Sequence, residues 1–217
     1  MNMMRFTTMK TKLRKYPSIF LILLLAISSC FLTGCVNQHP KDSKKSSQGE
    51  SVETMLEITD PKEKQAVLNA KAKVKALSGN PRIVATSPAV ADICDKLDLD
   101  LVGVPKSSVS KIPSRYKKVK KVGLAMSPDM EIVSSLNPDW ILAPSSLETD
   151  LKPKFEELKN TEYAFLNLRS VQGMYRSVQE LGEIFGKQQE AEKMTKEFTT
   201  FYKSYTKRLS LIHISEP

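Results

Sequence analysis

The residue with the clearest potential for ligand chemistry is Met126, in the stretch Gly-Leu-Ala-Met-Ser-Pro-Asp-Met-Glu at positions 123–131. A thioether is a soft, uncharged ligand for a metal ion. Ser127 is a favourable N-cap, Pro128 suits a first helical position and acidic residues follow, so the sequence predicts a helix that begins at Pro128. Met126 is then expected on a short turn at the helix start, where its side chain can project from the fold. The alternative is a flexible apolar residue that fills a gap under a loop.

Short β-branched runs alternate with amphipathic helical segments in the middle of the chain. The predicted strands are 82–86, 101–104, 139–143 and 163–166, and the predicted helices are 88–97, 128–136 and 147–159. This alternation predicts an α/β fold with a mainly parallel sheet and helices on both faces. Ligands of such folds bind beyond the carboxyl ends of the strands. We expect Thr86, Ser87, the loop that starts at Pro105 and Met126 at this edge.

Helical periodicity continues on both sides of the strands. Residues 60–81 contain a short helix expected to pack on the domain. After a helix over 171–185, residues 188–208 form a second helix whose aromatic residues recur every three or four positions, which is typical of a packing surface. Residues 209–217 resemble translated sequencing-adapter read-through. We therefore expect a non-native tail there and a natural protein that continues beyond this chain.

The N-terminal segment has the features of an export signal over residues 1–34, because five basic residues precede an apolar run. The run ends in Leu-Thr-Gly-Cys, which resembles the lipobox of bacterial lipoproteins. This resemblance implies that Cys35 is diacylated and anchors the protein to the membrane. An uncleaved transmembrane helix is the alternative, but the apolar run is shorter than the roughly 20 residues that span a bilayer. Residues 35–59 then form the lipid anchor and a polar, flexible tether.

The composition argues against several classes of protein. The formal net charge of +9 falls to +4 without residues 1–34, and the basic residues are not interleaved with aromatic ones, so nucleic-acid binding is not expected. The sequence has no nucleophile elbow, phosphate-binding glycine loop or paired acids, which argues against an enzyme. His39 and His213 are the two histidines, which disfavours a zinc or manganese receptor. Cys94 shares an apolar helical face and is expected to be a small buried hydrophobe.

The region from Arg82 to Arg208 resembles the ABC-importer binding lipoproteins that take up haem, siderophores and cobalamin. The resemblance rests on Gly-x-x-Met-x-Pro-Asp-x-Glu and on broader motifs, which are Arg82-Ile83-Val84, Asp95-Lys96-Leu97-Asp98-Leu99, Val102-Gly103, Pro113-Ser114-Arg115-Tyr116-Lys117, Leu136-Asn137-Pro138-Asp139 and Gln179-Glu180-Leu181-Gly182. It implies a class III substrate-binding protein in which residues 82–187 form the N-terminal parallel-sheet lobe. Residues 188–208 then start the interlobe helix, and we expect the second lobe to be absent from this chain.

The resemblance also implies a haem site. Met126 occupies the position of an axial iron ligand, with a histidine of the second lobe as the other ligand. Pro88 and Ala89 correspond to positions on the propionate side, where the Ala89 amide serves because Pro88 has no N–H. Ser107 and Ser108 match a second propionate-contacting loop, and Ser108 stands where the family has a tyrosine. Haem iron held by Met and His has a raised potential.

The same resemblance implies partners. Glu131 corresponds to the carboxylate that docks on arginines of the permease, although it is also a first-turn acid that stabilises its helix. We expect a monomer on the extracellular face of the cell membrane, supplied by upstream haem-relay surface proteins. The alternatives are a ferric-siderophore or cobalamin receptor, which needs basic or aromatic groups in place of a thioether, and a purely structural surface lipoprotein.

Overall fold

The computed structural model describes residue 58 and residues 60–213. The expectations for the export signal, for Cys35 and for His39 therefore fall outside the described residues. The helices are α2 (Pro61–Lys75), α3 (Pro88–Lys96), α4 (Met130–Ser135), α5 (Glu148–Glu156), α6 (Val171–Phe185) and α7 (Gln188–His213), with 3-10 turns η1 (Ser114–Tyr116) and η2 (Ser145–Leu147). The strands are β1 (Ile83–Ala85), β2 (Leu101–Val104), β3 (Lys120–Lys121), β4 (Gly123–Leu124), β5 (Ser127–Pro128), β6 (Trp140–Pro144) and β7 (Glu162–Leu166).

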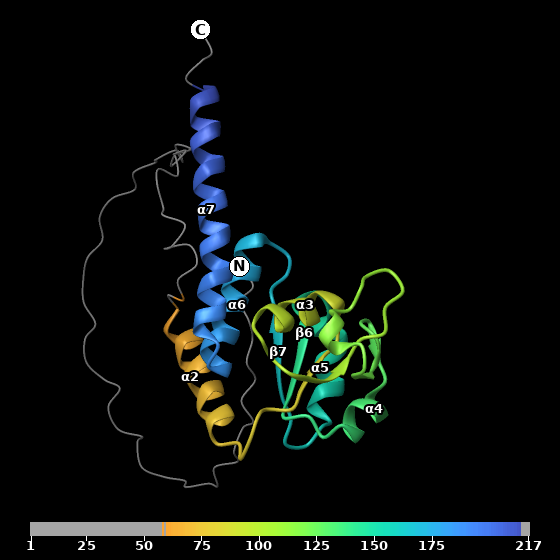
Figure 1. Ribbon diagram of the computed structural model, residues 1–217. Coiled ribbons are helices and arrows are strands. Elements are labelled where there is room, and N and C mark those ends of the chain that lie inside the picture. The colour runs from red at the N-terminus through yellow and green to blue at the C-terminus, as the bar shows by residue number, and fades with distance from the viewer. Residues whose placement is uncertain (1–57, 59, 214–217) are drawn as a thin grey trace, which may run out of the picture. The chain divides into compact units, whose positions relative to one another are not determined.

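The main sheet has the order β3-β2-β1-β6-β7, and all of its paired strands are parallel. The chain moves outward from β1 to β3 and then returns to the other side of β1, so the direction of winding changes between β1 and β6. A change of this kind leaves a crevice at the carboxyl ends of the two strands, where ligands of open α/β sheets bind. In Figure 1 the connection from α2 enters β1 at the lower edge, and the connection from β7 to α6 lies at the upper, carboxyl edge.

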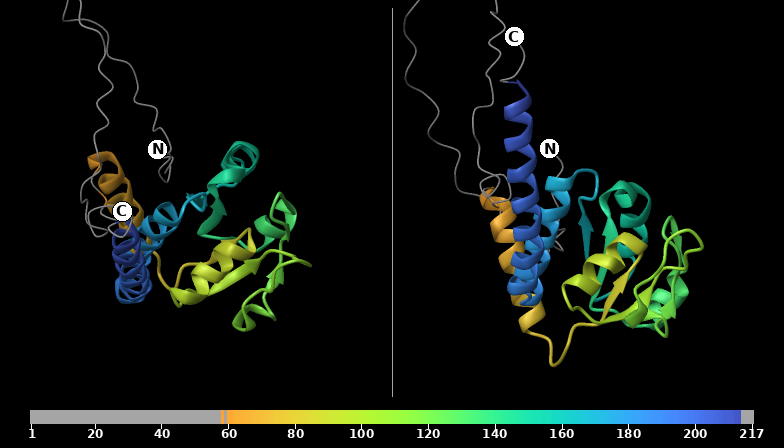
Figure 2. Two further views of the ribbon diagram at one scale, coloured as in Figure 1. Left: turned by 90° about the horizontal axis from the view of Figure 1, so that it is seen from above. Right: turned by 45° about the horizontal axis from the view of Figure 1, so that its top comes forward.

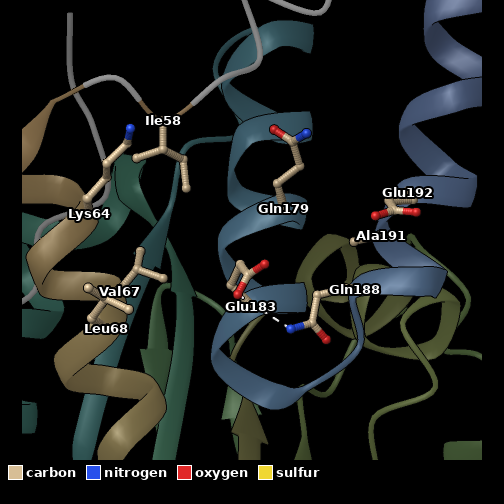
Figure 3. A pocket seen from close by; sticks show the side chains of 9 residues that line it. All are labelled: Ile58, Lys64, Val67, Leu68, Gln179, Glu183, Gln188, Ala191 and Glu192. Atoms are coloured by element: carbon tan, nitrogen blue, oxygen red, sulfur yellow. Dashed lines mark hydrogen bonds between the residues drawn. The ribbon is translucent and has the colours of Figure 1, made fainter.

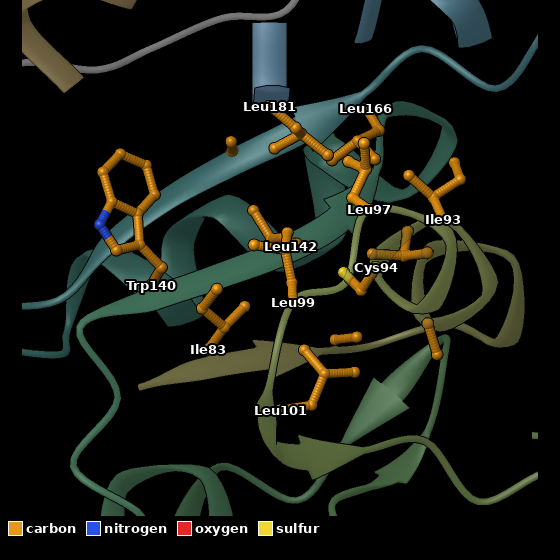
Figure 4. Close-up of a cluster of buried hydrophobic side chains, with 14 of the residues drawn as sticks. Ile83, Ile93, Cys94, Leu97, Leu99, Leu101, Trp140, Leu142, Leu166 and Leu181 are labelled. Carbon is orange, nitrogen blue, oxygen red and sulfur yellow. The ribbon is translucent and has the colours of Figure 1, made fainter. Parts of the chain in front are cut away.

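Strands β1, β2, β6 and β7 are covered on both faces of the sheet, which explains why they are largely continuous apolar runs. On one face Ile83 and Leu142 pack with residues of α3 and α6, as Figure 4 shows for Leu97 and Leu181. On the other face Val84 and neighbouring strand residues pack with α4 and α5. The prediction of a parallel α/β sheet covered by helices on both sides is confirmed.

Cys94 is fully buried on the inner face of α3, as its apolar neighbours predicted. Burial raises the pKa of its thiol to about 12, so the sulfur stays protonated at neutral pH. A thiol in this state is a poor nucleophile and a poor metal ligand. Cys94 is therefore a packing residue.

Three helices, α2, α6 and α7, lie side by side beyond the α3 face of the sheet, with α6 in contact with both others (Figures 1 and 2). The chain reverses between α6 and α7 at Gly186, whose φ of 71° is left-handed and suits glycine. Tyr175 of α6 stacks on Phe198 of α7 with a centroid distance of 4.4 Å, so the aromatic stripe is a packing surface at this level. Farther along α7, Phe201 and Tyr205 are exposed. The helix also continues to His213, five residues beyond the expected end.

Candidate functional site

Met126 lies at the tip of a small β-hairpin and not at a helix start. Gly123 and Leu124 pair antiparallel with Pro128 and Ser127, and Ala125 and Met126 form the turn between the two strands. The prediction that a helix begins at Pro128 with Ser127 as its N-cap is therefore wrong. Helix α4 begins at Met130, two residues later.

Asp129 caps α4 in place of Ser127. Its carboxylate oxygen Oδ1 accepts hydrogen bonds from the backbone N–H groups of Glu131 and Ile132, both at 3.1 Å. Its own N–H donates to the carbonyl of Val122 at 2.7 Å. These bonds close the chain on itself at the base of the hairpin, so the hairpin emerges from a fixed point between β3 and α4.

Gly123 allows the chain to leave β3 and enter the hairpin. Its φ is 93°, a value that residues with a side chain rarely adopt. A Cβ atom at this position would also lie 2.9 Å from the backbone nitrogen of Asp129. The hairpin that presents Met126 therefore depends on a glycine at position 123.

The hairpin exposes apolar side chains. Met126 is 73% exposed and Leu124 is 59% exposed, whereas Pro128 is buried beneath them. The interpretation of Met126 as a residue that fills a gap under a loop does not agree with this exposure. A thioether that projects into solvent from a fixed turn is available to a ligand, and Leu124 adds apolar surface beside it. The sequence did not predict Leu124 as a site residue. The available signal was its position directly after Gly123, two residues before Met126.

The loop after β2 adjoins the hairpin. The backbone N–H of Lys106 donates to the carbonyl of Gly123 at 2.7 Å, which brings the predicted residues Ser107 and Ser108 close along the chain to the hairpin base. Ser107 is half-buried, and its hydroxyl accepts a 3.0 Å hydrogen bond from the Ser110 N–H. Val109 is 95% exposed at the tip of this loop. The loop thus offers the hydroxyl of the exposed Ser108 together with an apolar side chain.

The far end of the same connection is fixed to the segment between α3 and β2. Arg115 donates to Asp98 at 2.9 Å and to Asp100 at 2.8 Å, and the hydroxyl of buried Tyr116 donates to the Leu99 carbonyl at 2.5 Å. Hydrogen bonds from Lys187 first, and then from Arg115, lower the pKa of Asp98 below its ordinary value. The loop that carries Ser107 and Ser108 is therefore held at both ends.

Pro88 and Ala89 form the first turn of α3 at the carboxyl end of β1. The Ser87 hydroxyl accepts a 3.3 Å hydrogen bond from Val90 N–H, which confirms its predicted role as the N-cap. Pro88 is half-buried and Ala89 is exposed. The Ala89 N–H has no carbonyl four residues back within the helix, so it is available to an anionic group. The predicted residues from three connections thus share one sheet edge.

Glu131 lies in the first turn of α4, and its side chain is exposed. The capping bonds come from Asp129, so the Glu131 carboxylate acts on the helix only through its charge. Glu131 follows Met126 by five residues, with strand β5 between them. The hairpin and this acidic position are therefore built on one continuous segment.

Other regions of the described chain offer less to a ligand of this kind. Residues 58 and 60–213 contain no group of three His, Cys, Asp or Glu side chains that could hold a metal ion. A cavity of about 420 Å³ opens between α2, α6 and α7, away from the sheet edge, and Figure 3 shows the side chains around it. Its lining is mixed, with Val67, Leu68 and Ala191 beside Lys64 and Glu183. None of the predicted site residues lines this cavity. No helix in the described part of the chain is both long and apolar enough to cross a membrane.

The chain belongs to the periplasmic binding protein family, whose model matches residues 83–212. It is 36% identical over 117 residues to the high-affinity heme uptake system protein IsdE of Staphylococcus aureus (strain Newman), a match that covers 54% of this chain and 39% of that protein. The names of these relatives are those of transport proteins and not of enzymes.

Two solved structures have the same fold at similar levels of identity. An ABC transporter substrate-binding protein from Listeria monocytogenes EGD-e is 41% identical, with a TM-score of 0.58 over 61% of this chain and 50% of that one. The structure of S. aureus IsdE complexed with heme is 34% identical, with a TM-score of 0.53 over 56% of this chain and 46% of that one. The chain thus spans about half the length of the solved structures it matches.

Proposed function

We propose that this protein is a lipid-anchored substrate-binding protein that delivers haem to an ABC importer. The observation that carries the proposal is the exposed thioether of Met126, held at the tip of a hairpin at the carboxyl edge of a parallel sheet. A neutral sulfur binds haem iron without adding charge to an apolar slot. The relative IsdE, whose solved structure is complexed with heme, supports this choice of ligand.

The rest of the edge suits the other parts of a haem molecule. Leu124 and Val109 offer apolar surface for the porphyrin plane, and the Ala89 N–H and the Ser108 hydroxyl are donors for propionates. Ser107 contributes its hydroxyl from the base of the same loop, and Pro88 forms the adjoining wall. Met126 supplies one axial ligand in this arrangement. A histidine of a second lobe supplies the other, which makes haem binding a property of two lobes.

The delivery step uses the other face of the same segment. Glu131 docks on the permease through its exposed carboxylate, and Cys35 holds the protein at the extracellular face of the membrane through its lipid. Residues 35–59 connect the lipid to α2. A haem taken from upstream surface proteins then passes from the monomeric binding protein to the importer.

A haemin titration followed by the Soret band tests the ligand. We expect haemin binding with a Soret band that depends on the sulfur of Met126. Met126→Leu keeps the apolar volume and removes the sulfur, so it is expected to weaken binding by about tenfold, or 1.4 kcal/mol, and to shift the band. Met130→Leu is the matched control, because Met130 is half-buried and packs against the core on the α4 side of the sheet.

The outcomes separate the candidate ligands. Identical spectra for the wild type and Met126→Leu would remove Met126 from the site. Binding of a ferric siderophore or of cobalamin without any response to haemin would favour the alternative transport role. Loss of binding in both methionine variants would show that the effect is not specific to the edge.

A further inference from the structure

Two acidic side chains are buried between α2 and α6 beside a half-buried arginine. Glu63 of α2 and Glu180 of α6 are 6% and 1% exposed, and Arg176 of α6 donates from Nη2 to Glu63 Oε2 at 2.7 Å. Charged side chains are seldom buried to this degree unless their charges balance. One arginine cannot balance two ionised carboxylates. If Glu63 and Glu180 were both ionised, the cluster would carry a net charge of −1 in a buried position.

The hydrogen bonds of the cluster indicate where the balance comes from. Glu63 Oε1 and Glu180 Oε2 are buried and have no N–H or O–H donor among the described residues. Arg176, which pairs with Glu63, lies one helical turn before Glu180 on α6, so the two carboxyl groups and the one guanidinium share one face of that helix. A proton held between them supplies the missing donor and leaves the cluster neutral, with one cation and one anion.

We propose that Glu63, Glu180 and Arg176 form a pH-sensitive clasp, in which a proton shared by the two carboxyl groups holds α2 on α6 and its loss loosens α2. The clasp joins residues 113 positions apart in sequence and holds the first described helix of the chain on the lobe. A change in this contact would alter how residues 61–75 pack on α6.

The titration of Glu180 fixes the direction of the effect. Burial, followed by the hydrogen bond to Glu63 and the charge of Glu63, raises the pKa of Glu180 from 4.5 to about 9, and the Arg176 charge opposes this. The groups that act on Glu180 are thus Glu63 of α2 and Arg176 of α6. In the described residues, α7 and β7, which also pack on α6, contribute no charged group to the shift. Because the folded state binds the proton more tightly, this stabilisation is complete below pH 4.5 and is lost as the pH rises through 9.

Hydrogen exchange in the full chain at pH 6, 7 and 8 tests the clasp. We compare protection factors because they correct the measured exchange rates for the intrinsic pH dependence of amide exchange. In the wild type we expect protection of the α2 amides to fall by up to about tenfold per pH unit, while protection in α3 stays constant. Glu180→Gln keeps the shape and carries a permanent N–H donor, so its α2 protection is expected to be the same at all three pH values.

The control is Glu183→Gln, on the same helix. Hydrogen bonding to Lys71 lowers the pKa of Glu183, so its titration lies below the tested range and this variant should follow the wild type. Constant α2 protection in the wild type, or equal slopes for the wild type and Glu180→Gln, would overturn the clasp. If Glu180→Gln does not fold, carbon-13 spectra of the wild-type glutamate carboxyls decide. One resonance titrating near pH 9 supports the clasp, and titration of all of them near 4.5 refutes it.

Discussion

The hairpin edge and the α2–α6 contact place side chains in opposite ways. At the edge, Met126 and Leu124 are apolar and exposed, although the fold has buried positions for residues of their kind. Between α2 and α6, Glu63 and Glu180 are acidic and buried, whereas the other acidic side chains of the described residues are exposed or half-buried. Each arrangement costs free energy when considered alone.

The two regions differ in which groups offset the unfavourable free energy of these placements. The α2–α6 contact is compensated within the chain, by Arg176 and by a proton. The exposed apolar side chains of the hairpin have no such partner among the described residues, and in the proposed function a bound haem covers them. The first region should therefore respond to mutation through stability, and the second through binding. Four substitutions test this contrast.

The largest effect on stability is expected from Arg176→Met. Removal of the guanidinium leaves the buried Glu63 without its cation, and breaking a buried ion pair in this way costs about 3 kcal/mol of unfolding free energy at pH 7. Urea unfolding followed by fluorescence of Trp140, the single tryptophan of the chain, measures the loss. Lys73→Met is the matched control, because its ion pair with Glu162 also joins α2 to the lobe but is well exposed. The control should change by less than about 1 kcal/mol. Equal losses would show that burial of the pair does not matter.

Gly123→Ala comes next, with an expected loss of about 2 kcal/mol. The substitution places a Cβ atom 2.9 Å from a backbone nitrogen at a φ of 93°, so both the contact and the conformation are unfavourable. Unfolding measurements should show a much smaller change for Gly79→Ala, where a Cβ would meet open space. If both variants lose the same stability, the hairpin does not require its glycine.

These two regions also show what could be predicted from the sequence. The strands were predictable because continuous apolar runs such as 140–144 are buried on both faces of a parallel sheet. Such a run can be recognised from neighbouring residues, without knowledge of which strands pair. The cap of α3 was equally local, since Ser87 and Pro88 act on their own helix. Site residues at the ends of strands could therefore be assigned to one edge before the structure was known.

The features that the sequence did not predict depend on contacts between residues that are distant in sequence, or on a choice between two suitable residues. Ser127 and Asp129 are both good N-caps, and the choice between them was made by the pairing of Gly123 with Pro128, which local propensity does not report. The clasp was hidden for the same reason. Arg176 and Glu180 are four residues apart, the spacing of an ordinary helical ion pair, and no local signal indicates that α2 places Glu63 on Arg176 from 113 positions away.

Asp129→Ala measures the competition between the two capping residues. Loss of the carboxylate that accepts from Glu131 N–H and Ile132 N–H is expected to cost about 1 kcal/mol. Ser127→Ala is the control, because Ser127 is exposed and lies in β5, and its stability should stay within about 0.5 kcal/mol of the wild type. A larger loss for Ser127→Ala than for Asp129→Ala in urea unfolding would restore the helix start at Pro128.

The smallest effect on stability is expected from Met126→Leu. A side chain that is 73% exposed makes few internal contacts, so the free energy of unfolding should change by less than about 0.5 kcal/mol. Thermal unfolding without ligand provides the measurement, and Leu142→Ala, at a fully buried position of β6, gives the scale with an expected loss of about 3 kcal/mol. A loss above about 1 kcal/mol for Met126→Leu would mean that the methionine packs into the protein, and the contrast between the two regions would disappear. An unchanged stability together with weaker haemin binding would instead assign Met126 to the ligand, because a substitution that leaves the fold intact can lower affinity only through the bound state.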